Sequence, residues 1–168
     1  MLSLKYYKHN PKAKDPIFAT RGSACFDLHA CFDDVNTYKV RQDTLTREIE
    51  KPLRNGVLQI FTMGRVLVPT GLIFDIPAGY SVRLHSRSGL AYKEGLYLTN
   101  CEGIIDHDYI EPVFAMMTNI SQAPKSMNNG DRICQAELVE KIQYDFIEIK
   151  KSPSQKTDRD GGFGSTGK

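Results

Sequence analysis

The apolar residues of this chain come in short runs that are separated by turn-forming residues. The runs lie at 57–61, 65–77, 80–86, 95–100, 112–119, 132–140 and 144–150. Turn signals separate them, among them Pro-Ala-Gly at 77–79 and Asn-Asn-Gly-Asp at 128–131. Short apolar runs bounded by Gly, Pro, Asn and Asp are typical of β-strands. Many strands at this spacing predict an all-β fold, an antiparallel sandwich or barrel.

Two segments depart from this pattern. Residues 87–93 follow a serine and contain helix-tolerant residues, which predicts one short helix whose first amides could face an anion. Residues 33–56 are highly charged with weak periodicity. They fit an inserted hairpin, a short helix at 43–51 or a loose loop, and the pattern does not choose among these. We expect one β domain over 1–152, with 33–56 as an insertion.

Length, composition and charge limit the kinds of partner and the location that we expect for this chain. A chain of 168 residues is long enough for one domain with a real core. Lys and Arg number 22 against 20 Asp and Glu, a net charge of +2, so no broad cationic field favours nucleic acid, whereas a small anionic ligand stays open. The N-terminus lacks the apolar core of a secretory signal. Nowhere in the sequence do about 18 apolar residues run together, as a membrane span would need. We therefore expect a soluble cytoplasmic protein, in the host cytoplasm if it is viral.

The four cysteines have no CxxC spacing and no His-rich neighbourhood. This spacing argues against a structural zinc site and predicts reduced, mostly buried thiols.

The C-terminal residues 153–168 are rich in glycine and hydroxyl side chains. Between 157 and 167 they combine an arginine, a phenylalanine, a serine, two threonines and four glycines. Glycines let main-chain N–H groups approach an anion, so the segment suits a flexible arm that closes over a phosphate chain. The same composition also describes a disordered tail.

Four further segments accompany this arm in a fixed order. They read GSACFDLHA at 22–30, HSRSGLA at 85–91, NCEGIIDHDYIEPV at 100–113 and GDRICQAEL at 130–138. With the arm, their order and spacing resemble the five motifs of the trimeric deoxyuridine triphosphatases, the dUTPases. The resemblance implies a jelly-roll β-sandwich that forms a homotrimer. It also implies active sites shared between subunits, with the arm closing from a third chain.

The activity implied by the resemblance is hydrolysis of dUTP to dUMP and pyrophosphate. Such an activity limits uracil incorporation into DNA and supplies dUMP for thymidylate synthesis. Asp106 is expected to orient and deprotonate the water that attacks the α-phosphorus, as a general base. Tyr109 would pack beneath the deoxyribose and exclude a 2′-hydroxyl, while Asp108 is expected to be structural.

The resemblance also implies which residues bind the uracil base and which bind the phosphates. The segment from Asn100 to Ile105 resembles a hairpin that reads uracil through main-chain groups. It includes Gly103 and Ile104, and Phe114 lies on the returning strand.

Arg87, Ser88, Gly89 and Gln135 are expected to contact the triphosphate, whereas Arg132 is expected to form a structural ion pair. A guanidinium, a hydroxyl and free amides make a sound anion cradle.

Asp27 resembles the aspartate that helps hold a hydrated Mg²⁺ on the triphosphate through water. In the arm, an aromatic ring would stack on uracil while polar groups reach the outer phosphates. These arm residues are Arg159, Phe163, Gly164, Ser165 and Thr166.

The arm departs from the family pattern in one respect. Arg159 precedes Phe163 by four positions rather than five, and Asp158 occupies the expected place of the arginine. A flexible arm can absorb the difference, or Lys156 can substitute as a less directional phosphate partner.

Two other functions fit parts of the pattern. One is a dCTP deaminase of the same fold, and the other is a dUTP-responsive regulator in which 33–56 contacts a protein partner. The DxDY sequence at 106–109 together with the glycine-rich arm favours the hydrolase.

Overall fold

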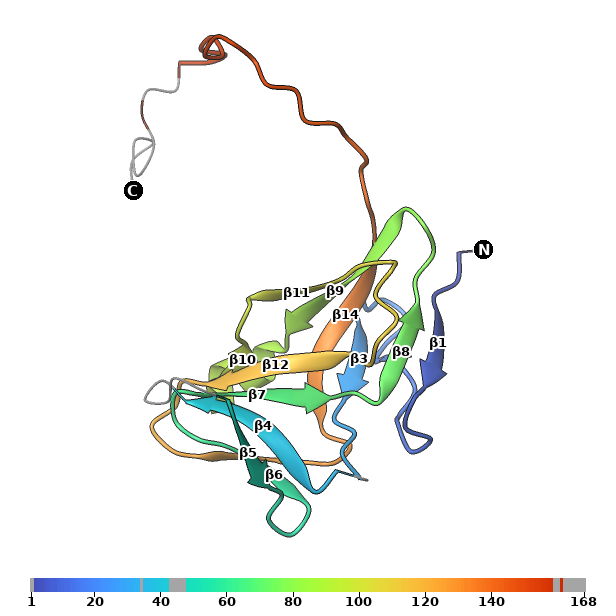
Figure 1. Cartoon of the computed structure of the whole chain (residues 1–168), viewed down its shortest axis with the longest axis vertical. Helices are drawn as coiled ribbons and strands as arrows, with labels where there is room; N and C mark the ends of the chain where they lie inside the picture. Colours follow the sequence, from blue (N-terminus) through green and yellow to red (C-terminus); the bar gives the residue numbers. More distant parts are fainter. Residues whose placement is uncertain (1, 34, 43–47, 159–160, 162–168) are drawn as a thin grey trace.

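Two five-stranded sheets form the body of the protein (Figure 1). The structure, a computed structural model, describes residues 2–33, 35–42, 48–158 and 161. One sheet has the strand order β10-β12-β7-β4-β5, and the other has the order β11-β9-β14-β3-β2. All these neighbours pair antiparallel. Two smaller pairs, β1-β8 and β13-β6, complete the fold.

The strand bounds are as follows. The first sheet contains β10 (Leu96–Leu98), β12 (Phe114–Asn119), β7 (Gly64–Pro69), β4 (Thr37–Gln42) and β5 (Ile49–Pro52). The second contains β11 (Glu102–Ile105), β9 (Tyr80–Ser86), β14 (Arg132–Glu140), β3 (Phe26–His29) and β2 (Ile17–Phe18). The small pairs are β1 (Lys5–Lys8) with β8 (Leu72–Asp75) and β13 (Lys125–Asn128) with β6 (Val57–Ile60).

One hydrophobic core joins the two sheets. Successive side chains of a strand point to opposite faces, so alternate apolar residues can face the core. In β7 the buried residues Val66 and Val68 alternate with partly exposed neighbours, and in β9 Val82 and Leu84 are buried. These residues belong to one continuous cluster of buried side chains. The predicted all-β sandwich is therefore confirmed.

The predicted run at 65–77 contains two strands rather than one. Strand β7 ends at Pro69 and β8 begins at Leu72. Between them Gly71 has a φ of 70°, in the region that favours glycine. A Cβ there would lie 2.9 Å from both the Ala13 Cβ and the Cys31 Sγ, so packing also excludes a side chain at this turn.

The charged segment at 33–56 forms a hairpin, the first of its three predicted alternatives. Strands β4 and β5 pair with each other, and β4 also pairs with β7, so the hairpin extends the first sheet. The alternative of a helix at 43–51 is wrong where it can be compared, because Ile49–Pro52 is a strand. Residues 43–47 lie outside the described residues.

The predicted short helix is confirmed as a π-helical turn, η1 (Leu90–Glu94). Gly95 ends it with a φ of 66°.

No helix in the described part of the chain is long and apolar enough to span a membrane.

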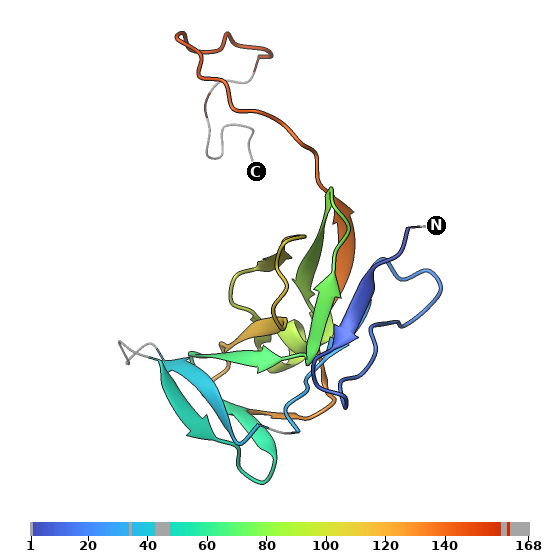
Figure 2. The same ribbon diagram turned by 45° about the vertical axis from the view of Figure 1, so that its right-hand side comes forward.

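The strand predicted at 144–150 is wrong. After β14 the chain runs away from the body as an extended segment without strand pairing, as Figures 1 and 2 both show. Its apolar side chains are exposed, among them Phe146 at 91 % and Ile147 at 83 %. A strand needs a partner edge for its main-chain groups, and this segment finds none among the described residues of its own chain.

The side chain of Asn119 connects the end of β12 to two other segments. It is fully buried, and its amide nitrogen donates to the carbonyl oxygens of Ile60 and Ala123, both at 2.9 Å. Its amide oxygen accepts from the Ser121 N–H at 2.9 Å and from the Ser121 hydroxyl at 2.7 Å. All four hydrogen-bonding positions of this buried amide are thus used.

We therefore expect Asn119→Ala to lower the free energy of unfolding by about 2 to 3 kcal/mol, because it removes the four hydrogen bonds of a buried amide, among them the bond to the buried Ile60 carbonyl. Urea denaturation followed by circular dichroism measures the change. Gln122→Ala, at an exposed position of the same loop, is the matched control and should change stability by less than about 0.5 kcal/mol. An equal effect of the two variants would contradict the role of the buried amide.

Candidate functional site

Asp27 is held by two arginines from distant segments. Its carboxylate is 10 % exposed, with the Arg87 Nε 3.3 Å from Oδ1 and the Arg132 Nη1 3.1 Å from Oδ2. Arg87 Nη1 also donates to the Arg132 carbonyl oxygen at 3.3 Å. The structural ion pair expected of Arg132 is therefore present, and its partner is the aspartate expected to act in Mg²⁺ binding.

A row of polar residues crosses four neighbouring strands beside this cluster. In the register of the sheet, Gln135 of β14 lies opposite Asp27 of β3 on one side and His85 of β9 on the other. His85 in turn lies opposite Glu102 of β11. Directly opposite residues have Cβ atoms about 5 Å apart. Gln135 is thereby placed next to Asp27 and its arginines.

Ser88 and Gly89 lie exposed directly after Arg87. A Cβ added at Gly89 would meet no atom within 4 Å, and the φ of −65° suits any residue. Among the residues that the structure describes, neither packing nor backbone conformation requires the glycine. The open space beside a guanidinium and a hydroxyl suits a bound anion.

The segment at 100–105 is not a paired hairpin, contrary to prediction. Strand β10 pairs with β12 and β11 pairs with β9, so the turn between them crosses from one sheet to the other. Cys101 has a φ of 62°, and its N–H donates to the Leu98 carbonyl at 3.1 Å. The Glu102 N–H donates to the Asn100 carbonyl at 2.6 Å, so much of the main-chain hydrogen bonding of this turn is used within the chain.

Ser86 anchors this turn, a role that sequence reasoning missed. Its hydroxyl accepts a hydrogen bond from the Leu98 N–H at 2.9 Å, which ties the end of β9 to β10. The only sign of this role in the sequence was the position of Ser86 next to Arg87. Its hydrogen-bond partner, Leu98, lies in another strand, so the sequence did not predict the contact.

Gly103 permits close packing of β11 on β9. A Cβ at this buried position would lie 3.0 Å from the Leu84 Cβ. Its neighbours differ in exposure, with Ile104 exposed and Ile105 half-buried.

Asp106 begins the exposed turn that follows β11. The turn closes through a hydrogen bond from the Tyr109 N–H to the Asp106 carbonyl at 3.1 Å. The Tyr109 hydroxyl donates to the Pro112 carbonyl at 3.2 Å, which orients the ring. The Asp106 carboxylate therefore stands in solvent beside a positioned aromatic side chain.

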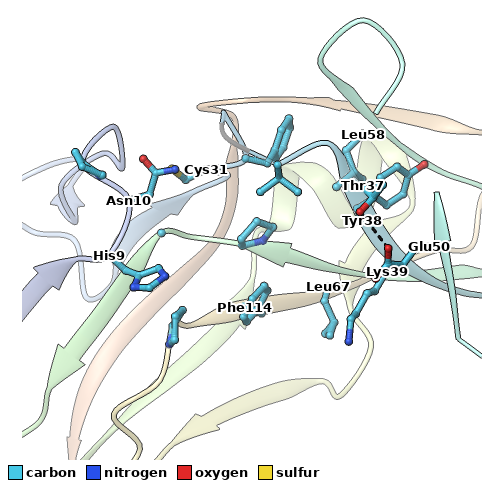
Figure 3. A pocket seen from close by; sticks show the side chains of 16 residues that line it. His9, Asn10, Cys31, Thr37, Tyr38, Lys39, Glu50, Leu58, Leu67 and Phe114 are labelled. Carbon is cyan, nitrogen blue, oxygen red and sulfur yellow. Dashed lines mark hydrogen bonds between the residues drawn. The ribbon is translucent and has the colours of Figure 1, made fainter. Parts of the chain in front are cut away.

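Phe114, at the start of β12, faces a different environment. It lines a cavity of about 600 Å³ together with residues of the 33–56 hairpin, including Tyr38, Glu50 and Lys39 (Figure 3). The lining is mainly apolar and includes neither Asp106 nor Arg87. This hollow is thus separate from both polar clusters.

Asp106 and Arg87 lie at opposite ends of the β9–β11 ladder. Ile105 is opposite Val82, so Asp106 is level with Ser81, one position beyond the ladder. Arg87 is six residues farther along β9 than Ser81, since 87 − 81 = 6. At about 3.3 Å per residue the separation is roughly 20 Å. One subunit therefore brings Arg87, Asp27 and Gln135 together but does not bring Asp106 to them.

The predicted arm residues cannot be placed in this site. Arg159, Phe163, Gly164, Ser165 and Thr166 all lie outside the described residues.

Burial changes the protonation of two groups near Asp27. Burial raises the pKa of the Cys134 thiol to about 12, and the Asp27 charge adds to the effect, so the thiol stays protonated. Burial also lowers the pKa of His29, with the nearby Lys14 charge acting in the same direction. His29 Nδ1 is buried without a hydrogen-bond partner among the described residues.

Comparison with known proteins connects this geometry to one family. The dUTPase family model matches residues 53–167. A deoxyuridine 5′-triphosphate nucleotidohydrolase of Dinoroseobacter shibae is 37 % identical over 154 residues, 91 % of this chain and 87 % of the relative.

Two solved structures share the fold. A mutant dUTPase of Staphylococcus bacteriophage 80alpha, determined with dUpNHpp, has a TM-score of 0.77 at 16 % identity, over 99 % of both chains. A mutant dUTPase from phage phi11 of S. aureus, whose structure concerns a structural Mg(II) ion, has a TM-score of 0.68 at 16 % identity. It covers 89 % of this chain and 98 % of that one.

The fold and the polar cluster around Asp27 define a β-sandwich protein. The chain belongs to the dUTPase family.

We expect the depressed pKa of His29 to make the protein less stable in mild acid. Above pH 7 the imidazole is neutral in both states. As the pH falls below its ordinary value of about 6.5, the unfolded chain takes up a proton that the folded chain resists, so the free energy of unfolding decreases.

His29→Gln should show a smaller loss of unfolding free energy between pH 7 and pH 5.5 than the parent protein. Urea denaturation at a series of pH values measures the free energy of unfolding of both proteins. Their difference at pH 8, where the imidazole is neutral, gives the packing cost of the substitution. Parallel pH dependences of the two proteins would refute the assignment.

Proposed function

We propose that this chain hydrolyses dUTP to dUMP and pyrophosphate. The observation that supports this most is the division of the family's polar residues into two clusters. Asp27, Arg87 and Gln135 gather near one end of the β9–β11 ladder, while Asp106 and Tyr109 stand at the other. Each cluster carries half of the chemistry that triphosphate hydrolysis needs.

The chain acts as a homotrimer with shared active sites. A distance of roughly 20 Å separates the base from the phosphate cradle within one subunit, so a second subunit must supply the other half. The exposed apolar segment after β14, with Tyr144, Phe146 and Ile147, gives the surface that such an assembly would cover. This segment also accounts for the strand pattern that finds no partner in one chain.

Asp106 orients the attacking water and accepts its proton. The water oxygen forms a bond to the α-phosphorus, the bond to the bridging oxygen breaks, and pyrophosphate leaves. An exposed carboxylate in a short turn is free to receive substrate from another subunit. Tyr109, held by its hydrogen bond to the Pro112 carbonyl, packs beneath the deoxyribose.

Uracil is read by main-chain groups between Asn100 and Ile105. The turn crosses between the sheets, so its amides and carbonyls are not all used by strand pairing. A polar readout of this kind rejects a base with the wrong donor pattern strongly. Phe114 is the predicted residue with the weakest support, because it lines the separate apolar cavity.

Arg87, Ser88, Gly89 and Gln135 bind the triphosphate. Arg87 supplies fixed positive charge, and the open space at Gly89 lets phosphate oxygens approach the backbone. Such positioned charges stabilise the transition state of phosphoryl transfer.

Mg²⁺ is the expected cofactor, and the residues present fit an indirect contact. Both oxygens of Asp27 already accept from arginines, so its carboxylate suits a hydrogen bond to a metal-bound water rather than a direct bond to the ion. When bound, Mg²⁺ neutralises the triphosphate charge.

The remaining parts of the proposal concern the ends and the hairpin. Residues 1–152 act as the β domain, with 33–56 as an insertion able to contact a protein partner. Residues 153–168 act as the arm, with contacts from Arg159, Phe163, Gly164, Ser165 and Thr166.

The four free cysteines support a reducing cytoplasmic location. No observation favours the deaminase or the regulator.

Asp106→Asn tests the proposed chemistry. We expect kcat for dUTP to fall by about 10² to 10⁴-fold with little change in KM, because the amide cannot accept the proton. Pyrophosphate release is measured with dUTP, dCTP, dTTP and UTP, with Mg²⁺ and with a chelator.

Asp108→Asn is the matched control, a carboxylate in the same exposed turn, and it should retain turnover within a few-fold. Equal losses in both variants would contradict the specific role of Asp106. Absence of turnover of every nucleotide by the folded parent protein would refute the hydrolase.

Tyr109→Ala tests the discrimination against ribose. Removing the ring should open space for a 2′-hydroxyl and lower the ratio of kcat/KM for dUTP over UTP by about tenfold or more. Tyr109→Phe keeps the ring but loses the bond to the Pro112 carbonyl, so it should keep most of the preference. A ratio unchanged in Tyr109→Ala would exclude this role.

A further inference from the structure

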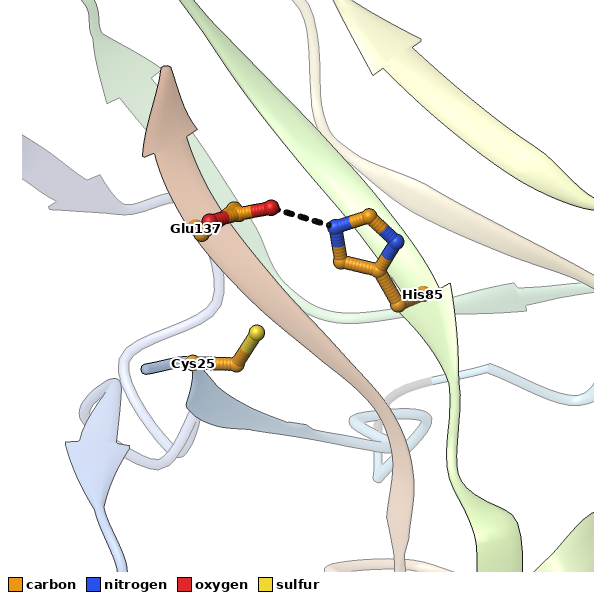
Figure 4. A group of neighbouring side chains, drawn as sticks. All are labelled: Cys25, His85 and Glu137. Carbon is orange, nitrogen blue, oxygen red and sulfur yellow. Dashed lines mark hydrogen bonds and ion pairs between the residues drawn. The ribbon is translucent and has the colours of Figure 1, made fainter. Parts of the chain in front are cut away.

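Cys25, His85 and Glu137 converge on the outer face of the second sheet (Figure 4). Cys25 directly precedes β3, His85 lies in β9, and Glu137 lies in β14, the strand between them. One potential ligand atom from each residue lies within 4.8 Å of the other two. The His85 Nε2 and Glu137 Oε1 are 3.0 Å apart. All three side chains are partly buried.

Strand alternation explains why these residues meet. The neighbouring residues Phe26, Leu84 and Ala136 are paired across the same three strands and face the core. Residues one position away point to the opposite face. A thiol, an imidazole and a carboxylate are thereby gathered from sequence positions far apart. The cysteine spacing therefore gave no sign of them and predicted no structural zinc site.

The donor set is that of a borderline-soft cation. Zn²⁺ binds thiolate sulfur at about 2.3 Å and imidazole nitrogen or carboxylate oxygen at about 2.0 to 2.2 Å, usually as a tetrahedron. These lengths place neighbouring ligand atoms about 3.3 to 3.7 Å apart, so the present cluster needs only small side-chain movements. Mg²⁺ prefers oxygen ligands and is not matched by a thiolate.

A second group of contacts supports the imidazole from behind. The Glu102 Oε1 lies 3.9 Å from the His85 Nδ1, on the ring nitrogen that the cluster does not use. Arg83 fixes Glu102 through an ion pair of 3.1 Å, and the Arg83 Nε also donates to the Ser81 hydroxyl at 3.2 Å. Metal-binding histidines commonly direct their second nitrogen to a carboxylate, which sets the tautomer and the ring orientation.

We propose that Cys25, His85 and Glu137 form a site for a zinc-like divalent cation, with a fourth position open to water. On binding, the Cys25 thiol releases its proton to solvent, and the His85 Nε2 exchanges its hydrogen bond to Glu137 for the metal. The ion connects three adjacent strands, β3, β14 and β9. The site uses neither Asp106 nor the triphosphate cradle, so it stands independently of the proposed hydrolysis.

Co²⁺ is the probe that distinguishes this site from surface carboxylates. Metal-free full-length protein is titrated with Co²⁺ in the presence of millimolar Mg²⁺ and then with Zn²⁺. We expect a sulfur-to-cobalt charge-transfer band and the strong visible bands of a tetrahedral ion, both lost when Zn²⁺ displaces Co²⁺. Zn²⁺ should also raise the Tm.

Cys25→Ser should abolish the charge-transfer band and weaken binding at least tenfold, and His85→Ala, which keeps the thiol, should also weaken binding at least tenfold. Cys101→Ser, which removes the exposed thiol, is the matched control and should keep both spectrum and affinity. Circular dichroism of each variant shows that the fold is intact. Absence of the band in the parent protein, or its persistence in Cys25→Ser, would overturn the proposal.

Discussion

The buried charge of Asp27 is the constraint on which the arrangement of the polar clusters depends. A carboxylate removed from water is costly unless cations and hydrogen bonds compensate it. Here Arg87 and Arg132 meet its two oxygens, and they come from the end of β9 and the start of β14. One charge therefore fixes the relative positions of three segments that are far apart in sequence. Arg87 is held in place before any ligand arrives.

The strand lengths of the second sheet and the alternation of its side chains determine where the other polar residues lie. Opposite residues share a face, so Asp27, Gln135 and His85 form one row while their neighbours Phe26, Ala136 and Leu84 form the core. Because β9 and β11 run antiparallel, the segment after β11 emerges at the end of the ladder opposite to Arg87. The division of the polar residues between two ends is thus a property of strand direction. Under the proposed function, assembly of subunits would bring the two ends together in one site.

Sequence periodicity predicted half of the strands in the described residues, because alternate burial leaves a local pattern that survives tertiary packing; it gave no sign of β1, β2, β3 or β13. It identified β9 and β14 at their observed bounds and located the short helix. It was wrong at 144–150, where a strand-like pattern has no partner edge in its own chain. It also mistook the segment at 100–105 for a hairpin, because a turn between two sheets looks like a turn within one. For 33–56, the pairing of β4 with β7 decided the outcome, and that contact is not local.

The motifs indicated which residues to look for but not how those residues are arranged. The family motifs indicated Asp27, Arg87 and Asp106, yet the double ion pair and the separation along the ladder come from register. The Cys25 cluster could not be anticipated, since it depends on three strands lying side by side. Its donors include sulfur and nitrogen, which suit a softer cation than the all-oxygen ligands that Mg²⁺ prefers. A cation on Glu137 would sit two residues from Gln135 on β14, and one on Cys25 would sit two residues from Asp27. Binding there would restrain the strands that carry Asp27 and Gln135 without contacting either residue.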